Sequence, residues 1–97
     1  MLIHSEQLSG TCSGGTFSVN TAFLRGICHH IVIKPTTETT TYSVKMVNNI
    51  SATIFDRTSE TGTLSEFIGL PLRGIYTITV YDSIVDELFT TQLNIEE

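Results

Sequence analysis

The stretch Gly74–Glu97, GIYTITVYDSIVDELFTTQLNIEE, decides the fold class. Apolar and polar side chains alternate in each of its halves, Ile75–Asp82 and Leu88–Glu96. The apolar members are Tyr76, Ile78, Val80, Phe89, Leu93 and Ile95. A period of two buries one face of a β-strand and leaves the other face in water. We therefore predict a β-hairpin whose turn is Ser83–Glu87, with Asp82 and Asp86 as its polar turn residues.

The composition indicates one β domain over residues 1–97. Hydrophobic residues make up 40% of the chain and tryptophan is absent, so Ile, Val, Leu and Phe must build the core. Charged residues are only 15% of the chain, against ~25% in an ordinary soluble domain, and strand-favouring threonine takes their place. Because exposed strands are usually protected by Lys and Glu, the weakly charged surface predicts a protein that lives in an assembly.

Short alternating segments separated by turns every eight to twelve residues or so predict six to eight strands. Besides the final two, the segments are Leu2–Leu8, Thr16–Asn20, Ile27–Lys34, Tyr42–Val47, Ser51–Asp56 and Thr63–Ile68. The last of these is expected to be a strand or an irregular crossover. Arg57–Gly62 should be an exposed loop, and Pro71 and Gly74 should bracket a turn. The predicted architecture is an all-β antiparallel sandwich, either jelly-roll-like or immunoglobulin-like.

Strand alternation also predicts which side chains share a face. The run Ile27–Lys34 is the most apolar, so it should be a central strand that Pro35 ends. The sets expected to share a face are Tyr42, Val44 and Met46, all inward; Ile27, Ile31 and Ile33; Cys28, His30 and Val32; and Ala52 and Ile54. Leu2–Leu8 alternates poorly, so residues 1–9 are expected to form either a first strand or an arm that contacts a neighbouring subunit.

Charge and cysteine content exclude several classes of function. The chain has a net charge of −5 with only five Lys and Arg, so it lacks the basic footprint of a nucleic-acid-binding protein. No apolar run of ~18 residues is present to span a membrane, and the N-terminus has no secretory signal pattern. We therefore expect synthesis in a cytoplasm, where Cys12 and Cys28 should stay free thiols.

The residues that best suit chemistry are His29 and His30, with Cys28 beside them and His4 and Cys12 upstream. Imidazole and thiolate are zinc ligands. Neighbours on a strand point to opposite faces, however, so only Cys28 and His30 should share a side. No metal-ligand spacing and no G-x-S-x-G nucleophile motif occurs. The sequence therefore predicts no metal site, no catalytic residue and no enzyme.

Two further clusters have simpler interpretations as turns. Asp82, Asp86 and Glu87 lack the calcium-loop pattern, and aspartate is favoured in turns for local hydrogen bonding. Gly14-Gly15 precedes a strand rather than a helix, so it is not a phosphate cradle. No cofactor-binding residue is predicted. Surface contact remains, and the N-terminal arm and an exposed aromatic set spanning Tyr42–Tyr81 are candidates for it.

Four stretches together resemble small virion-associated proteins of tailed bacteriophages. They are LRGICHHIVIKPTTETTTYSVKMVN (Leu24–Asn48), Gly62-Thr63-Leu64, LPLRGIYTITVYDS (Leu70–Ser83) and DELFTTQLNIEE (Asp86–Glu97). The resemblance rests on the pattern of short, threonine-rich strands rather than on catalytic motifs, and it carries over no site residue. It implies a structural protein of the virion, made in the host cytoplasm: a capsid decoration (cement) protein, or a tail or neck subunit.

The partners that the resemblance implies are the major capsid protein or tail and neck proteins, with self-association into a homo-oligomer. Neither nucleic acid nor membrane is expected as a partner. A second alternative is an immunoglobulin-like adhesion or carbohydrate-binding module, which the missing secretory signal and the absence of tryptophan disfavour.

Overall fold

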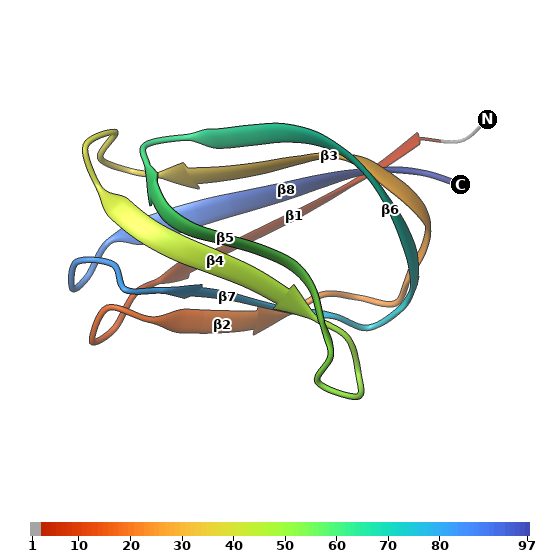
Figure 1. Ribbon diagram of the computed structural model, residues 1–97, viewed down its shortest axis with the longest axis horizontal. Coiled ribbons are helices and arrows are strands. Elements are labelled where there is room, and N and C mark those ends of the chain that lie inside the picture. Colours follow the sequence, from red (N-terminus) through yellow and green to blue (C-terminus); the bar gives the residue numbers. More distant parts are fainter. Residues whose placement is uncertain (1–2) are drawn as a thin grey trace.

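The computed structural model describes residues 3–97 as eight β-strands in two four-stranded sheets (Figure 1). The strands are β1 (Ile3–Thr11), β2 (Phe17–Asn20), β3 (Leu24–Pro35), β4 (Thr41–Val47), β5 (Thr53–Thr61), β6 (Leu64–Gly74), β7 (Thr77–Tyr81) and β8 (Leu88–Glu96). One sheet has the order β1-β8-β3-β6 and the other has the order β2-β7-β4-β5. The described residues contain no helix, so none that could span a membrane. The predicted β-sandwich is confirmed.

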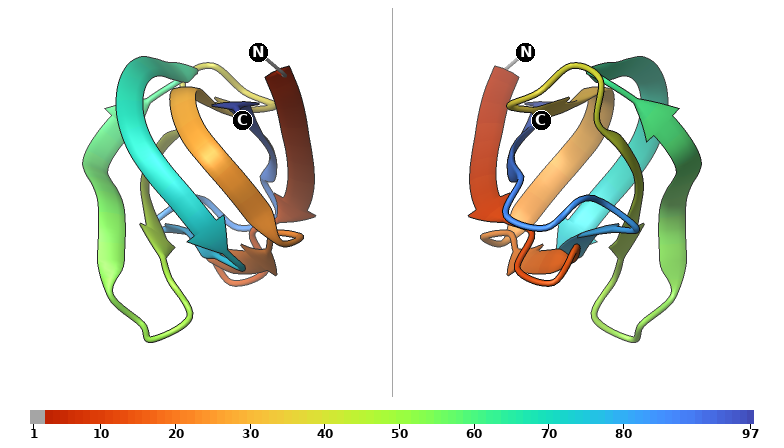
Figure 2. Two further views of the ribbon diagram at one scale, coloured as in Figure 1. Left: turned by 90° about the vertical axis from the view of Figure 1, so that its right-hand side faces the viewer. Right: turned by 90° about the vertical axis from the view of Figure 1, so that its left-hand side faces the viewer.

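The pairing pattern identifies which kind of sandwich this is. The first strand pairs with the last, the second with the seventh, the third with the sixth and the fourth with the fifth, all antiparallel. Strand β3 also pairs with β8, which joins β1–β8 and β3–β6 into one sheet. Strand β4 also pairs with β7, which joins β2–β7 and β4–β5 into the other. Such a rolled-up arrangement is the eight-stranded jelly roll, one of the two architectures expected. End-on views show the two sheets curving around a common interior (Figure 2).

The hairpin predicted for Gly74–Glu97 is wrong, although both of its strands exist. Strand β7 pairs with β2 and β4, whereas β8 pairs with β1 and β3, so Ser83–Glu87 crosses from one sheet to the other. Alternation reports which face of a strand is buried, and it carries no information about the partner strand. The sequential antiparallel pair is β4–β5, where the Asn48 side chain accepts hydrogen bonds from the amides of Ile50 (3.1 Å) and Ala52 (2.9 Å).

Residues 3–9 belong to an ordinary edge strand of their own chain. Strand β1 pairs with β8 without a register shift, from Ile3 opposite Glu96 to Thr11 opposite Leu88. Residues 1–2 of the expected arm lie outside the described residues. An edge strand has one unpaired side, which another chain could pair with. Contact between this edge and a neighbouring subunit therefore stays a prediction.

The core lies between the sheets and is built from alternating positions of both. Tyr42, Val44 and Met46 point inward as predicted. Thr91 also lies inward, fully buried, because it shares the apolar face of β8. The other large buried side chains are Leu24, Cys28, Ile31, Ile33, Phe55, Leu72, Tyr76, Ile78, Val80, Phe89, Leu93 and Ile95.

A β-bulge in β3 overturns the face assignment made for this strand. The register shifts between Cys28 and His30 against both neighbouring strands, so His29 is an extra residue. A bulge inverts the alternation on one side of it. Cys28 is consequently buried with Ile31, while Ile27 is 43% exposed on the outer face. The prediction that Cys28 and His30 share a side is wrong for the same reason, although β3 is central in its sheet as expected.

The middle of the chain contains longer strands than predicted. Arg57–Gly62 is not a loop, since β5 continues to Thr61. Ala52 lies before this strand, whose buried residue is Phe55, while Ile54 is partly buried. One of the two register shifts in the β4–β5 pair, between Met46 and Val47, lies beside the start of β5. Thr63–Ile68 is largely strand, because β6 begins at Leu64. Pro71 lies inside β6 rather than in a turn, which an edge strand tolerates.

Candidate interaction surface

The outer face of the β1-β8-β3-β6 sheet carries a hydrogen-bonded row of polar side chains that crosses all four strands. Ser5 Oγ donates to Asn94 Oδ1 at 2.7 Å, and Gln92 Nε2 donates to the same oxygen at 3.0 Å. Asn94 Nδ2 lies 3.2 Å from His30 Nδ1, and His30 Nε2 lies 2.7 Å from Ser65 Oγ. The row exists because these positions are register neighbours on one face of the sheet.

The row assigns the tautomer of His30. Asn94 Oδ1 accepts two bonds, which leaves its amide nitrogen as the donor to His30 Nδ1. A neutral imidazole that accepts at Nδ1 carries its proton on Nε2, so His30 donates to Ser65. The imidazole is therefore fixed in orientation by one partner on each neighbouring strand.

An exposed aromatic ring rests on this fixed imidazole. Phe67 stacks on His30 with 4.4 Å between ring centroids and 16° between ring planes. Phe67 is nonetheless 82% exposed. With Ile27 and Pro71, which face each other across β3 and β6, these residues form an area that we call the aromatic patch. An exposed ring held by its neighbour is the kind of anchor that protein interfaces bury.

The bulge adds a polar margin to the aromatic patch. The extra residue His29 projects beside the end of β8, where its Nε2 lies 2.9 Å from a Glu96 carboxylate oxygen. The pair is half-exposed, so it contributes little to stability. It instead places a polar pair beside an apolar area, which is the usual composition of an interface rim.

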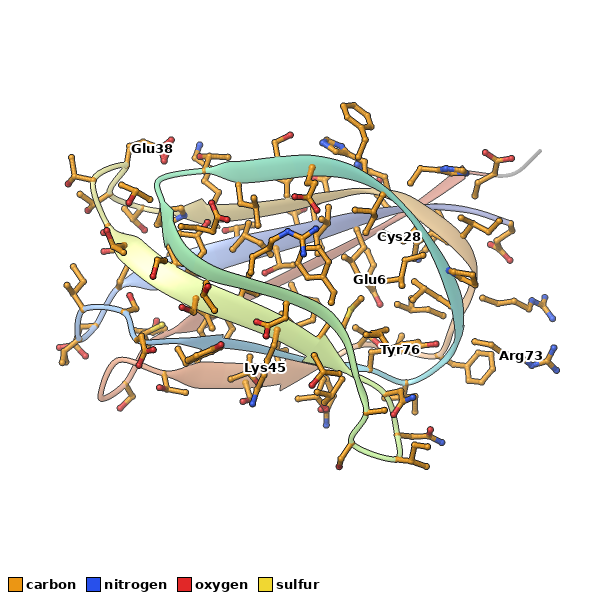
Figure 3. All side chains as sticks on the ribbon, in the orientation of Figure 1. Glu6, Cys28, Glu38, Lys45, Arg73 and Tyr76 are labelled. Carbon is orange, nitrogen blue, oxygen red and sulfur yellow. The ribbon has the colours of Figure 1, made fainter. Side chains whose placement is uncertain are left out.

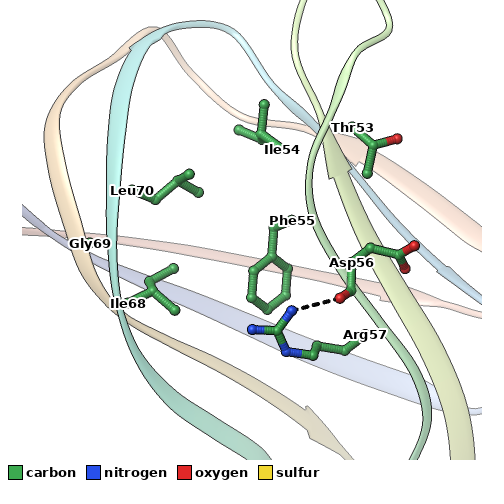
Figure 4. A pocket seen from close by; sticks show the side chains of 8 residues that line it. All are labelled: Thr53, Ile54, Phe55, Asp56, Arg57, Ile68, Gly69 and Leu70. Atoms are coloured by element: carbon green, nitrogen blue, oxygen red, sulfur yellow. Dashed lines mark hydrogen bonds between the residues drawn. The ribbon is translucent and has the colours of Figure 1, made fainter.

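A second feature is an open groove between β5 and β6, the edge strands where the two sheets diverge (Figure 4). It has a volume of about 380 Å³, and it is lined by Thr53, Ile54, Phe55, Asp56, Arg57, Ile68, Gly69 and Leu70. The Arg57 guanidinium lies 4.6 Å from the Phe55 ring and donates to the Asp56 carbonyl at 2.7 Å. Its other nitrogens bind both carboxylate oxygens of Glu66 on β6.

This Arg57–Glu66 pair explains an irregularity in the sequence pattern. Glu66 occupies an inward position of β6, between Leu64 and Ile68, where an unpaired carboxylate would be costly. Two hydrogen bonds from Arg57 offset that cost and join the edge strands of the two sheets. Arg57, which lines the groove, is consequently held in place by a structural ion pair.

The residues singled out for metal or thiol chemistry do not converge. Cys12 follows β1 and Cys28 lies on β3 opposite Ile95, near the other end of β8, so the two free cysteines are separated by most of the sheet. Burial raises the pKa of both thiols above the ordinary value. Among residues 3–97, no three His, Cys, Asp or Glu side chains lie close enough to hold a metal ion. His4 lies on β1, in a hollow with Phe23 and Arg25.

The turn clusters have structural roles. The Glu87 carboxylate is buried and accepts hydrogen bonds from Thr37 N (2.8 Å) and Thr40 Oγ1 (3.1 Å). Gly14 and Gly15 both have positive φ, 69° and 87°, in the turn between β1 and β2. A Cβ on Gly15 would lie 2.7 Å from the Ser83 carbonyl oxygen, so this glycine permits close packing of two loops.

One expected contact set is corrected and one surface residue was missed. Tyr42 is completely buried and Tyr76 nearly so, and neither is available to a partner. Phe67 was not singled out, because the segment TLSEFI does not alternate clearly. Its outward position opposite Leu64 and Ile68 was the available signal once β6 was assigned as a strand.

Comparison with known proteins supports the fold alone. No family model and no curated protein sequence matches the chain. The solved structures that it resembles include the Yersinia pseudotuberculosis-derived mitogen, with TM-score 0.62, 8% identity and coverage of 99% of this chain and 89% of that one. A subunit of the Bacillus endospore appendages, described as disulfide-linked pili, has TM-score 0.61 and 13% identity, with coverage of 97% and 86%.

A viral protein is also among these structures. The C-terminal domain of A223, a structural protein from Sulfolobus turreted icosahedral virus, has TM-score 0.52 and 13% identity, with coverage of 97% of this chain and 100% of that one. At such identities a shared fold does not transfer an activity. The chain is thus similar to proteins of several different roles that use one small all-β sandwich.

Proposed function

We propose that this chain is a non-enzymatic virion structural protein of a tailed bacteriophage that decorates the capsid and stabilises the head through subunit contacts. In this proposal the aromatic patch is the surface that binds the major capsid protein. The edge of β1 lies along the margin of the same sheet and contributes to the contact. The chain reaches the virion after synthesis in the host cytoplasm.

The observation that carries the proposal is the exposed Phe67 ring stacked on His30. Its imidazole support is held by Asn94 and Ser65, so little conformational freedom is lost when a partner covers the ring. Burial of apolar surface stabilises a contact by ~25 cal/mol per Å². A pre-organised aromatic anchor on the outer face of a weakly charged sheet suits binding to another protein surface better than binding to a small molecule.

Two of the similar structures support a role in assemblies. One is a structural protein of Sulfolobus turreted icosahedral virus, and the other belongs to the pili that form Bacillus endospore appendages. Jelly rolls are used repeatedly in viral capsids, and the outer faces and loops of the two packed sheets remain free for contacts. The low charge of the chain agrees with extensive contact in a particle.

Quantitative mass spectrometry of purified particles of the encoding phage tests the proposal. A decoration protein is expected in hundreds of copies, in fixed ratio to the major capsid protein, because it follows the symmetry of the head. About a dozen copies would instead support the alternative role in the neck or tail. Absence of the chain from particles would refute a virion role altogether.

A carbohydrate-binding module remains the second candidate, and one observation favours it. Phe67 lies beside hydrogen-bonding groups of His30 and Ser65, and an aromatic ring next to polar groups can stack on a sugar. Jelly rolls also include lectin domains. Binding on a glycan array that is lost in Phe67→Ala would support this candidate over the structural one.

A further inference from the structure

The two ends of the molecule carry complementary apolar and charged groups. One end is the β7–β8 connection, residues 82–87, and the other is formed by the β2–β3 and β6–β7 connections. These ends lie at opposite extremes of the longest axis (Figure 1), along which the molecule extends 38 Å. We call them the acidic tip and the basic end.

The acidic tip presents two apolar side chains between two aspartates. Ile84 is 56% exposed and Val85 is 62% exposed. Asp82 and Asp86 flank them with φ of 55° and 65°, a left-handed conformation that aspartate adopts more readily than most residues. No Lys, Arg or His among residues 3–97 lies within 4.0 Å of either aspartate carboxylate.

The backbone of the acidic tip is held rigidly by the neighbouring turn. Ser83 N donates to the Gly15 carbonyl at 3.1 Å, and Asp86 N donates to the Cys12 carbonyl at 2.8 Å. Cys12 N donates in return to the Glu87 carbonyl at 2.8 Å. Because these bonds fix the loop before any contact, little ordering entropy opposes its docking.

The basic end presents two arginines and two exposed apolar residues. Arg25 on β3 and Arg73 on β6 are directly opposite each other in register, and Phe23 and Ile75 are exposed beside them. Arg73 projects away from the body of the molecule (Figure 3). A hollow of about 310 Å³ lies here, lined by His4, Phe23, Leu24, Arg25 and Glu97.

The two arginines form no ion pair with the described part of the chain, although Glu97 lines the same hollow as Arg25. Within residues 3–97, ion pairs shorter than 4.0 Å join His29 to Glu96 and Arg57 to Glu66, and neither includes Arg25 or Arg73. Like charges opposite each other on neighbouring strands repel. Two of the five cations of an acidic chain are thus placed where an external carboxylate would relieve their repulsion.

We infer that the occupant of the basic end is the acidic tip of a second copy of this chain. Ile84 and Val85 would cover Phe23 and Ile75, and Asp82 and Asp86 would approach the two arginines. Because the two surfaces differ and lie at opposite ends, the contact is heterologous and joins copies head to tail. It does not depend on which particle the chain joins, so its failure would leave the proposed function standing.

The contact between the two ends is small, and a small buried area is typical of weak association. The two shorter dimensions of the molecule are 25 and 18 Å, so an end-to-end contact buries on the order of 900 Å² counting both copies, which is the range of weak complexes. We therefore expect self-association at micromolar or higher concentrations. It should weaken severalfold as NaCl is raised from about 0.05 M to about 0.5 M, because the charges are exposed.

Two half-blocked variants test the geometry by analytical ultracentrifugation over about 5–500 µM protein. Arg73→Glu blocks the basic end, and the double variant Ile84→Ser, Val85→Ser blocks the acidic tip. Each should be monomeric alone, and an equimolar mixture should form a one-to-one dimer that grows no further, because one complementary pair of ends survives. Ile50→Ser, at the β4–β5 turn and 78% exposed in the native chain, is the control and should associate like the native chain.

Several outcomes would overturn the inference. These are a native chain that stays monomeric over the whole range, half-blocked variants that still associate alone, and a mixture that stays monomeric. A symmetric dimer through the aromatic patch would be recognised because Phe67→Ala, and not Arg73→Glu, abolishes it. Circular dichroism checks that every variant is folded, and Arg73→Gln replaces Arg73→Glu if the latter is not.

Discussion

Phe67 lies almost parallel to the His30 imidazole, 4.4 Å away between centroids, while most of its surface remains in contact with water. The imidazole beneath it is held from β8 by Asn94 and from β6 by Ser65. A solvent-exposed ring contributes little to folding, so the arrangement is of more use to a partner than to the chain itself. This contrast between folding and binding gives the first prediction.

Replacing Phe67 by alanine should separate binding from stability. We expect Phe67→Ala to weaken binding to capsids that lack the protein by about tenfold or more, since a pre-organised anchor is lost. The melting temperature should change little, because the side chain is exposed. Co-sedimentation with such capsids measures the first effect and calorimetry the second. Ile50→Ala is the matched control, and equal binding by both variants would contradict the assignment of the patch.

Gly26 should tolerate no side chain. Its φ is 126°, and a Cβ would lie 2.4 Å from the Glu96 carbonyl oxygen, where β8 passes. We expect Gly26→Ala to lower the free energy of unfolding by about 3 kcal/mol. Gly69→Ala, on the edge strand β6 with nothing within 4 Å of its Cβ, should change it by less than ~0.5 kcal/mol. Urea unfolding measures both, and similar values would disprove the close approach of β3 and β8.

Thr91 offers a substitution that should stabilise the protein. Its hydroxyl is fully buried on β8 and has no hydrogen-bond partner among residues 3–97. Such a group costs ~1–3 kcal/mol, and valine has nearly the same shape. We therefore expect Thr91→Val to raise the free energy of unfolding by about 1 kcal/mol. Thr90→Val, on the outer face of the same strand, should be close to neutral. A destabilising effect of Thr91→Val would reveal a hydroxyl partner.

Tyr42 should make stability depend on alkaline pH. Its phenol donates to the Gly62 carbonyl at 2.8 Å, and burial, with a smaller effect from the charge of Glu60, raises the pKa of Tyr42 to about 12. The pKa in the unfolded chain is ~10. The neutral phenol therefore stabilises the fold fully below about pH 10, and this contribution is lost as the pH rises towards 12.

The Tyr42→Phe variant checks the sign of this dependence. It should cost about 1 kcal/mol at neutral pH, because one buried hydrogen bond is lost. Above about pH 10 its unfolding free energy should fall less steeply than that of the native chain. Urea unfolding from neutral to alkaline pH compares the slopes. Parallel curves would show that the phenol ionises equally in both states.

Side-chain alternation was sufficient to predict the sandwich, because a buried face and a wet face require a period of two. Tyr42, Val44 and Met46 were placed correctly on that basis. Alternation fails at bulges, since one inserted residue exchanges the faces. His29 is such a residue, and it is the reason that Ile27 and Cys28 were assigned to the wrong sides.

The partners of the strands could not be predicted from the same pattern. The segments around Ile78 and Leu93 look like two arms of one hairpin, yet they belong to different sheets. Which strands meet depends on how the whole chain rolls up, and local sequence does not encode it. The candidate surface was hidden for a related reason: Phe67 becomes conspicuous only once its neighbour His30 is known.

The nested pairing of the strands also constrains how the protein is made. Strand β1 has β8 as its neighbour in the sheet, and β3 lies on the other side of β8. Strand β1 therefore has no neighbour in its sheet until residues 88–96 have been synthesised. We expect nascent chains that end before β8 to remain unfolded and to depend on chaperones, because contacts between distant segments form late.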